Sequence, residues 1–218
     1  MAEARRVWIE TRQPDMANIL ERLVFIDETS LKTNLVKTTG WAPVGARLID
    51  HAPFGHWNTQ TFIADLAHDG LIAPWVLDGA MNGASFDAYV EHQLAPALKP
   101  GQIVIADNLS SHKSPRAQAL LRAQGNDLIF LPPYSPDRSA RLRGPTGATV
   151  TPHPIEIIRA FTRTDGVHAL ILSKLKTLNR KTAARTCQAL WTCAGAVCDL
   201  FPSQECTNYF KAVGYGLD

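Results

Sequence analysis

Two acidic residues, Asp27 and Asp107, each follow a short apolar run, in "LVFID" and "QIVIAD". Such runs are typical of buried strands whose carboxylate emerges at the C-terminal end. Carboxylates brought side by side repel each other unless a hard dication such as Mg²⁺ or Mn²⁺ lies between them. With a third carboxylate, the cluster could hold two ions about 3.5–4 Å apart and cleave or join phosphodiesters. Each Asp could instead cap a loop by accepting backbone N–H groups, and that alternative stays open.

The segments around these acids predict an α/β domain. The runs on either side of "HDG" predict a hairpin, and "GARLIDHAP" before it predicts the second strand. The segment 85–98 predicts a helix capped by Ser85. A second helix is predicted to start with Ser114 as cap and Pro115 as first residue and to close at Gly125, before a strand in "DLIFLPPY". The order β-β-β-α-β-α-β, with acids ending the first and fourth strands, predicts a mixed sheet.

The last third of the chain predicts a long helical tail, from about residue 154 to residue 198. Before it, residues 138–152 contain Arg, Gly, Pro and Thr without apolar periodicity, which predicts a flexible, solvated loop. The cysteines lack C-x-x-C spacing and are interpreted as small buried hydrophobes rather than zinc ligands or disulfides. They are Cys187, Cys193, Cys198 and Cys206.

Bulk properties exclude little. The 218 residues fit one domain, and their 45% hydrophobic content suffices for a substantial core. A formal charge of +2 is too small to indicate a nucleic-acid partner by itself. The start of the chain lacks the apolar stretch of a signal peptide, and no run is long enough to span a bilayer. The sequence therefore predicts a cytoplasmic protein without membrane contact.

The sequence motifs around the acids resemble those of a known family, the bacterial insertion-sequence transposases of the mariner superfamily, specifically the insertion-sequence family numbered 630. The matching phrases are "LVFIDETSLKTN", "GWAPVGARL", "IVIADNLSSHKS", "LIFLPPYSPD" and "SKLKTLNRKTAARTCQALW". The resemblance implies a ribonuclease H-like fold, two essential aspartates followed by a third acid, and Mg²⁺- or Mn²⁺-dependent cutting and joining of DNA at transposon ends. By matching position, Asp27 is the first catalytic acid and metal ligand, and Asp107 is the second.

Three further residues belong to the same motifs and are assigned a supporting role: Glu28, Asn108 and His112. For His112 two interpretations stay open: it orients a phosphate or a carboxylate, or it caps the following helix.

The third acid departs from the family pattern. The family spacing puts it at position 142, where this chain has Leu142, and the first glutamate met is Glu156 in "HPIE". Pro154 suits the first turn of a helix, and Glu156 would face the positive end of its dipole, so Glu156 is predicted as the third catalytic acid and metal ligand. Asp137 is the alternative. Residues 138–172 are interpreted as an atypical insertion of inserted or out-of-frame material, as in a decayed copy.

The resemblance also predicts how the domain is organised. Residues 1–20 form a lead-in too short for the helix-turn-helix that reads transposon terminal repeats, and residues 21–218 form the catalytic domain, interrupted at about 138–172. The expected partners are the terminal inverted repeats, target DNA, a separate or missing helix-turn-helix module and a second copy in a homodimer. The alternative is an inactive, truncated copy that keeps only the fold and weak DNA binding. A ribonuclease H-like nuclease unrelated to transposition is a third option.

Basic residues on the tail are candidates for DNA phosphates, with a solvated helix face as the alternative. They are Lys174, Lys176, Arg180, Lys181 and Arg185. Four tryptophans are interpreted as core residues, with stacking on bases as the alternative. They are Trp41, Trp57, Trp75 and Trp191.

Overall fold

The computed structural model describes residues 2–36, 40–49, 51, 54, 57–132, 166–212 and 215. The strands are β1 (Leu23–Lys32), β2 (Thr59–Ala67), β3 (Gly70–Asp78), β4 (Ile103–Ala106) and β5 (Asp127–Phe130). The helices before and between the strands are α1 (Ala2–Val7), η1 (Trp8–Arg12), α2 (Gln13–Ala17), η2 (Leu20–Arg22), α3 (Gly83–Tyr89), η3 (Val90–Leu94), α4 (Ala95–Ala97), η4 (Ser110–His112) and α5 (Pro115–Ala123). The tail forms α7 (Gly166–Thr182), α8 (Cys187–Cys198) and α9 (Ser203–Ala212).

The strands form one mixed sheet in the order β3-β2-β1-β4-β5. Strand β2 pairs antiparallel with both β1 and β3, which forms a meander. Strand β4 pairs parallel with both β1 and β5. Antiparallel neighbours need only a tight turn, but the parallel pairs need crossovers, which α3 to α4 and α5 supply. The predicted α/β order of strands and helices is confirmed over these elements.

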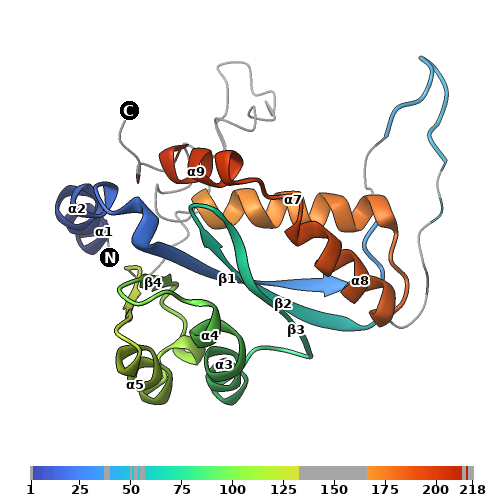
Figure 1. Cartoon of the computed structure of the whole chain (residues 1–218). Coiled ribbons are helices and arrows are strands. Elements are labelled where there is room, and N and C mark those ends of the chain that lie inside the picture. Colours follow the sequence, from blue (N-terminus) through green and yellow to red (C-terminus); the bar gives the residue numbers. More distant parts are fainter. Residues whose placement is uncertain are drawn as a thin grey trace.

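Helices cover both faces of the sheet (Figure 1). The α3, α4 and α5 side holds one apolar cluster, to which β1 contributes Ile26 and β4 contributes Val104. The α7, α8 and α9 side holds the other, to which the same strands contribute Phe25 and Ile105. Successive strand residues point to opposite faces, so continuous apolar runs are required in strands covered on both sides.

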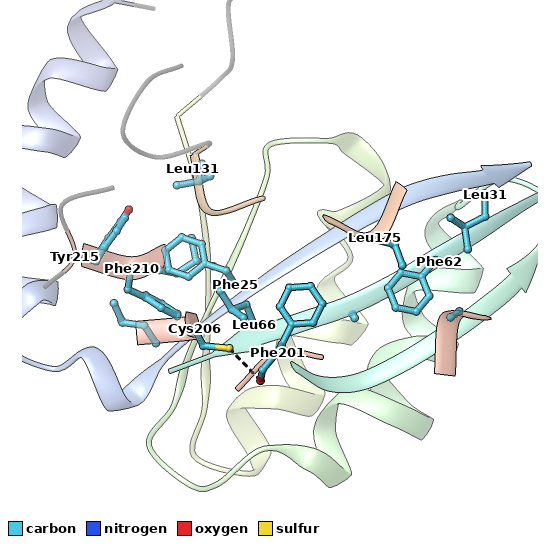
Figure 2. Close-up of a cluster of buried hydrophobic side chains, with 14 of the residues drawn as sticks. Phe25, Leu31, Phe62, Leu66, Leu131, Leu175, Phe201, Cys206, Phe210 and Tyr215 are labelled. Atoms are coloured by element: carbon cyan, nitrogen blue, oxygen red, sulfur yellow. Dashed lines mark hydrogen bonds between the residues drawn. The ribbon is translucent and has the colours of Figure 1, made fainter. Parts of the chain in front are cut away.

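The aromatic centre of the second cluster ties both ends of the chain to the sheet (Figure 2). The Phe25 ring packs edge-on against Phe210 of α9 at 5.4 Å between centroids and against Tyr215 at 5.0 Å. Trp8 of η1 is buried in the same cluster and donates its indole N–H to the Tyr215 hydroxyl. Offset aromatic pairs of this kind stabilise a core beyond their buried area.

The four cysteines are free thiols. Cys193 and Cys206 are buried, which confirms the prediction of small core residues for these two, whereas Cys187 and Cys198 are half-buried. In Figure 2 the Cys206 thiol donates to the Phe201 carbonyl.

Several predicted boundaries are wrong. Strand β1 does not end at Asp27 but continues to Lys32, because it keeps β2 as a partner after its pairing with β4 has ended. Residues 46–49 of "GARLIDHAP" form no strand. Asn82, not Ser85, caps α3, since its side chain accepts the Ser85 backbone N–H. The cap at Ser114 is confirmed.

The tail is helical as predicted over residues 166–198 but divided into α7 and α8, and α9 lies beyond the predicted end at residue 198. Helix α7 ends where Ala183 adopts a left-handed conformation with φ of 50°. The predicted start of the tail near 154 and the predicted loop at 138–152 lie outside the described residues. In the parts of the chain that the structure describes, no helix has both the length and the apolar character to cross a membrane.

Candidate active site

Asp27 lies in β1, and Asp107 directly follows β4, the neighbouring parallel strand. The register pairs Phe25 with Ile105, and each aspartate is two residues further along its own chain. Because side chains alternate along a strand, Asp27 continues the face of Phe25, which belongs to the core under α7 and α9. Asp107 follows the end of β4, and its carboxylate contacts His112, a ring that packs against Phe86 of α3.

The end of β4 leaves one side of β1 unpaired by a described strand near these carboxylates. Strand β4 ends at Ala106, so beyond Phe25 strand β1 has β2 alone as a described partner. Asp27 and Asp107 are both half-buried there, Asp27 within β1 and Asp107 directly after the end of β4. This position at the carboxyl end of parallel strands is where open α/β sheets bind ligands.

Each aspartate also accepts a backbone N–H. The Glu28 N–H donates to Asp27 Oδ1 at 2.8 Å, and the Leu109 N–H donates to Asp107 Oδ1 at 3.1 Å. These are the bonds that the loop-cap alternative predicts. A carboxylate has room for about four hydrogen bonds or metal contacts, so one backbone bond does not exclude metal binding.

His112 links the segment after β4 to strand β1. Its Nδ1–H donates to Asp107 Oδ1 at 2.6 Å, and its Nε2 lies 3.7 Å from Glu28 Oε2, an ion-pair distance. The ring is buried and tilts against Phe86 of α3 at 4.7 Å between centroids. Burial by itself lowers the pKa of His112, but the carboxylates of Asp107 and Glu28 outweigh burial and raise this pKa to about 9.

The contact of His112 with Asp107 and Glu28 favours the first of its two predicted interpretations, orientation of a carboxylate. Helix α5 has its own cap in Ser114, so capping does not require His112. Sequence reasoning placed Glu28 and His112 in the right motifs but missed that they meet. No spacing signal could have shown it, because Glu28 lies in β1 and His112 lies in η4, far along the chain.

The residues present suit a hard cation. Asp27 and Asp107 offer carboxylate oxygens, the ligands that Mg²⁺ and Mn²⁺ prefer. The His112 ring lies between the carboxylates of Asp107 and Glu28, and its raised pKa favours a positive charge at this place. Within the described residues, no group of three or more His, Cys, Asp or Glu side chains has the geometry of a metal site. Glu156, the predicted third ligand, and Asp137, its alternative, lie outside the described residues.

The five basic tail residues fall into two groups. Lys174 and Arg185 bind within the protein: Lys174 Nζ pairs with Glu205 at 2.6 Å, and the Arg185 guanidinium donates to the carbonyls of Thr33 and Leu35. Lys181 is exposed on α7, whereas Lys176 and Arg180 are half-buried there. Asn108 is half-buried beside Asp107.

The core interpretation of the tryptophans is wrong for three of them, Trp41, Trp57 and Trp191. Trp41 is 99% exposed and Trp57 is 55% exposed, and both belong to the connection between β1 and β2. Trp75 is half-buried and stacks on Tyr89, while Trp191 is 45% exposed and donates to Gln60. Gly40, Pro43 and Gly45 near Trp41 were the available signal that this segment leaves the sheet.

Residues 22–140, more than half of the chain, match the family model described as DDE superfamily endonuclease. The chain therefore belongs to the DDE superfamily endonucleases, which confirms the predicted enzyme class. No curated protein matches it in sequence.

Solved structures with a similar fold include three of Mos1 transposase. The first is a paired-end complex with the left transposon end, with a TM-score of 0.51 and 18% sequence identity, covering 99% of this chain and 63% of that chain. The second is a strand transfer complex, with a TM-score of 0.50 and 18% identity, covering 99% of this chain and 62% of that chain. The third is a paired-end complex with Mn, with a TM-score of 0.50 and 18% identity, covering 97% of this chain and 62% of that chain. This chain spans less than two thirds of the length of those chains. At this identity the likeness concerns the fold, and it confirms the predicted ribonuclease H-like class.

Proposed function

We propose that this chain is the catalytic domain of a transposase that cuts DNA at transposon ends and joins those ends to target DNA. The observation that carries the proposal is that Asp27 in β1 and Asp107 after the adjacent parallel strand β4 each lie two residues beyond the paired Phe25 and Ile105, in a chain of the DDE endonuclease family. The Mos1 structures support it, because two of them hold paired transposon ends and one is a strand transfer complex.

The chain's own residues have distinct roles in this proposal. Asp27, Asp107 and Glu156 hold Mg²⁺ or Mn²⁺, and His112 and Glu28 orient Asp107. The Mos1 paired-end complex with Mn supports a divalent metal. When bound, such ions activate a water or a 3′-hydroxyl and stabilise the leaving oxygen of a phosphodiester.

The finer assignments rest on the sequence resemblance alone. They are membership of the bacterial insertion-sequence family numbered 630, an atypical insertion before the third acid, a homodimer, and a helix-turn-helix module that reads the terminal inverted repeats. A cytoplasmic location is a separate proposal, which rests on the apolar pattern of the sequence. A DNA-reading module is required by function, because a phosphate-binding catalytic surface carries no sequence information.

One observation favours a second candidate, an inactive copy that keeps the fold and weak DNA binding. The family position for the third acid holds Leu142, and a leucine cannot bind a metal ion. Under this candidate Asp27 and Asp107 remain as a pair without the third ligand that a two-ion site needs.

A cleavage assay separates the two candidates. The chain is incubated with Mn²⁺ and transposon-end DNA, with a helix-turn-helix module supplied, and strand nicking is measured. The proposal predicts nicking that is lost in Asp27→Asn and Asp107→Asn and retained in Asp127→Asn, a matched control at an exposed residue of β5. Absence of nicking in the parent chain, with DNA binding intact, would establish the inactive copy.

A further inference from the structure

Asp65 is an ionisable group in the core on the α3 side of the sheet. It lies on β2 with no exposed surface, opposite Ile26 of β1 and Ile72 of β3. The same core consists of buried side chains such as Ile63, Ala73 and Tyr89. A buried charged carboxylate without a cation is costly, so Asp65 requires an explanation.

The two contacts of the Tyr89 hydroxyl explain how Asp65 is accommodated in this core. The Tyr89 hydroxyl lies 2.5 Å from Asp65 Oδ2 and 2.9 Å from the Ala73 carbonyl oxygen. A tyrosine hydroxyl has one hydrogen, so it cannot donate to both oxygens. If Asp65 carries a proton on Oδ2, that proton is donated to Tyr89, and Tyr89 donates to Ala73. Both short contacts are then hydrogen bonds.

An ionised Asp65 fits the surroundings poorly. It would take the Tyr89 hydrogen and leave the buried Ala73 carbonyl without that bond. Its other oxygen, Oδ1, has no hydrogen-bond partner among the described residues. Burial raises the pKa of Asp65 to about 8, and the Tyr89 bond opposes this shift only in part. Strands β1 and β3 and helix α3 place Ile26, Ile72, Ala73 and Tyr89 around Asp65. Among these four neighbours only Tyr89 is titratable, and burial raises its pKa further.

The acceptor at the end of this chain of bonds lies in a β-bulge. Between the pairs Ile63–Trp75 and Asp65–Ile72, strand β2 has one residue, Ala64, and β3 has two, Ala73 and Pro74. Ala73 has a φ of 49°, a conformation that a residue with a Cβ rarely adopts. Such strain persists only where neighbouring structure fixes it, and the Tyr89 hydrogen bond does so.

The bulge lies at the same level across the strands as Asp27 of the candidate active site. Ala64 faces the bulge on one side and pairs with Asp27 on its other side. The extra residue also turns Trp75 toward Tyr89, on which it stacks at 5.8 Å between centroids. Bulges bend a strand and redirect its side chains, and they are frequent beside active sites.

We propose that Asp65 is a neutral carboxylic acid whose proton is donated to Tyr89, and that the chain of bonds from Asp65 through Tyr89 to Ala73 is a positioning device that fixes the bulge beside Asp27. The neutral acid stands independently of any activity, whereas the link to Asp27 rests on the proposed function.

The protonation state is measured first. Carbon NMR of the Asp65 carboxyl in the unmodified chain is expected to show a neutral acid at pH 6 that ionises near pH 8. The folding equilibrium constant, relative to that of Asp65→Asn, is expected to fall by close to tenfold per pH unit between about pH 4 and pH 8, because the folded state binds the extra proton in this interval. A carboxylate at pH 6 would overturn the proposal.

The positioning role is measured with two isosteric variants. Asp65→Asn keeps a donor toward Tyr89, since its amide has N–H groups, whereas Tyr89→Phe removes both bonds. Hydrogen exchange of amides 72–76 is expected to stay near wild type in Asp65→Asn and to accelerate at least tenfold in Tyr89→Phe, with β4 and β5 unchanged. Unchanged exchange at 72–76 in Tyr89→Phe would refute the positioning role.

Mn²⁺ affinity tests the link to the active site. Tyr89→Phe is expected to bind Mn²⁺ several-fold more weakly than the parent chain, and Asp65→Asn is expected to match it. If Tyr89→Phe binds Mn²⁺ as the parent does while Asp27→Asn does not, the link to Asp27 fails and the proposed function stands. If Asp27→Asn also binds Mn²⁺ normally, the proposed metal site fails, and the exchange and NMR results still decide the role of Asp65.

Discussion

At the scale of single residues, the site depends on contacts that orient carboxylates. His112 donates to Asp107 and lies near Glu28, so it joins the loop after β4 to strand β1. Partners that hold a metal ligand in place tune a site almost as strongly as the ligands themselves. The same reasoning applies to the third acid, whose identity the family spacing leaves open between Glu156 and Asp137.

The identity of the third acid is a testable prediction. Glu156→Gln is expected to weaken Mn²⁺ affinity by roughly tenfold or more and to remove DNA nicking, because it deletes a carboxylate ligand. Asp137→Asn is the matched control and is expected to change neither. Calorimetry with Mn²⁺ on the full chain provides the measurement. Normal Mn²⁺ binding in Glu156→Gln together with a loss in Asp137→Asn would reverse the assignment.

The acids themselves were predictable from the sequence, but their surroundings were not. Asp27 and Asp107 stand out because each follows an apolar run, a local signal. The contact between His112 and Glu28, and the buried pair of Asp65 and Tyr89, join residues that are distant in the chain. Such pairs depend on strand order and register, which no local pattern of residue types specifies.

At the scale of elements, α7 has residues of two kinds. Lys174 binds Glu205 of α9 and the Leu200 carbonyl, and its ammonium lies 4.4 Å from the centre of the Phe201 ring. Lys181 is exposed on the same helix. A lysine engaged in these contacts is a connection between helices, whereas an exposed one is available for a phosphate.

This difference predicts opposite effects of two substitutions. Lys174→Gln is expected to lower the free energy of unfolding by about 1 kcal/mol, the size typical of a partly exposed ion pair, and to leave DNA affinity unchanged. Lys181→Gln is expected to leave the free energy of unfolding unchanged. It is expected to reduce the slope of log affinity for DNA against log salt concentration by about 1, the effect of losing one phosphate contact. Urea unfolding and salt-dependent DNA titration measure the two effects. Loss of DNA affinity in Lys174→Gln alone would contradict this division.

The junction of α7 and α8 gives an element-scale prediction about stability. Ala183 has a φ of 50° and is exposed, and its N–H donates to the Asn179 carbonyl, an arrangement usual for glycine after a helix. Ala183→Gly is expected to raise the free energy of unfolding by about 0.5–1 kcal/mol by relieving this strain. Ala119→Gly, at an exposed position inside α5, serves as control and is expected to cost about 1 kcal/mol. Destabilisation by Ala183→Gly would contradict the expectation.

Elements were predictable where local signals agreed. The strands β4 and β5 and the cap at Ser114 follow from apolar runs and from the serine–proline pair. The extension of β1 past Asp27 was not predictable, because its polar residues are held in the strand by pairing with β2. The cap of α3 moved to Asn82 because both Asn and Ser suit that role and the tertiary fold selects between them.

At the scale of the whole molecule, the sheet joins two cores that serve different purposes. The core under α3 to α5 contains Asp65 and its hydrogen bonds to the bulge. The core under α7 to α9 anchors the tail through Phe25, Phe210 and Tyr215, as Figure 2 shows. Asp27 belongs to the strand between these cores, so its position depends on the packing of both faces.

The central claim is that Asp27 and Asp107 hold a divalent metal together. Calorimetric titration of the full chain with Mn²⁺ tests it most directly, using Asp27→Asn, Asp107→Asn and the control Asp127→Asn, with circular dichroism to establish folding. The account predicts that each of the first two variants stays folded and loses Mn²⁺ affinity by at least tenfold, while the control binds as the parent chain does. Folded Asp27→Asn or Asp107→Asn chains that bind Mn²⁺ with parental affinity would contradict it.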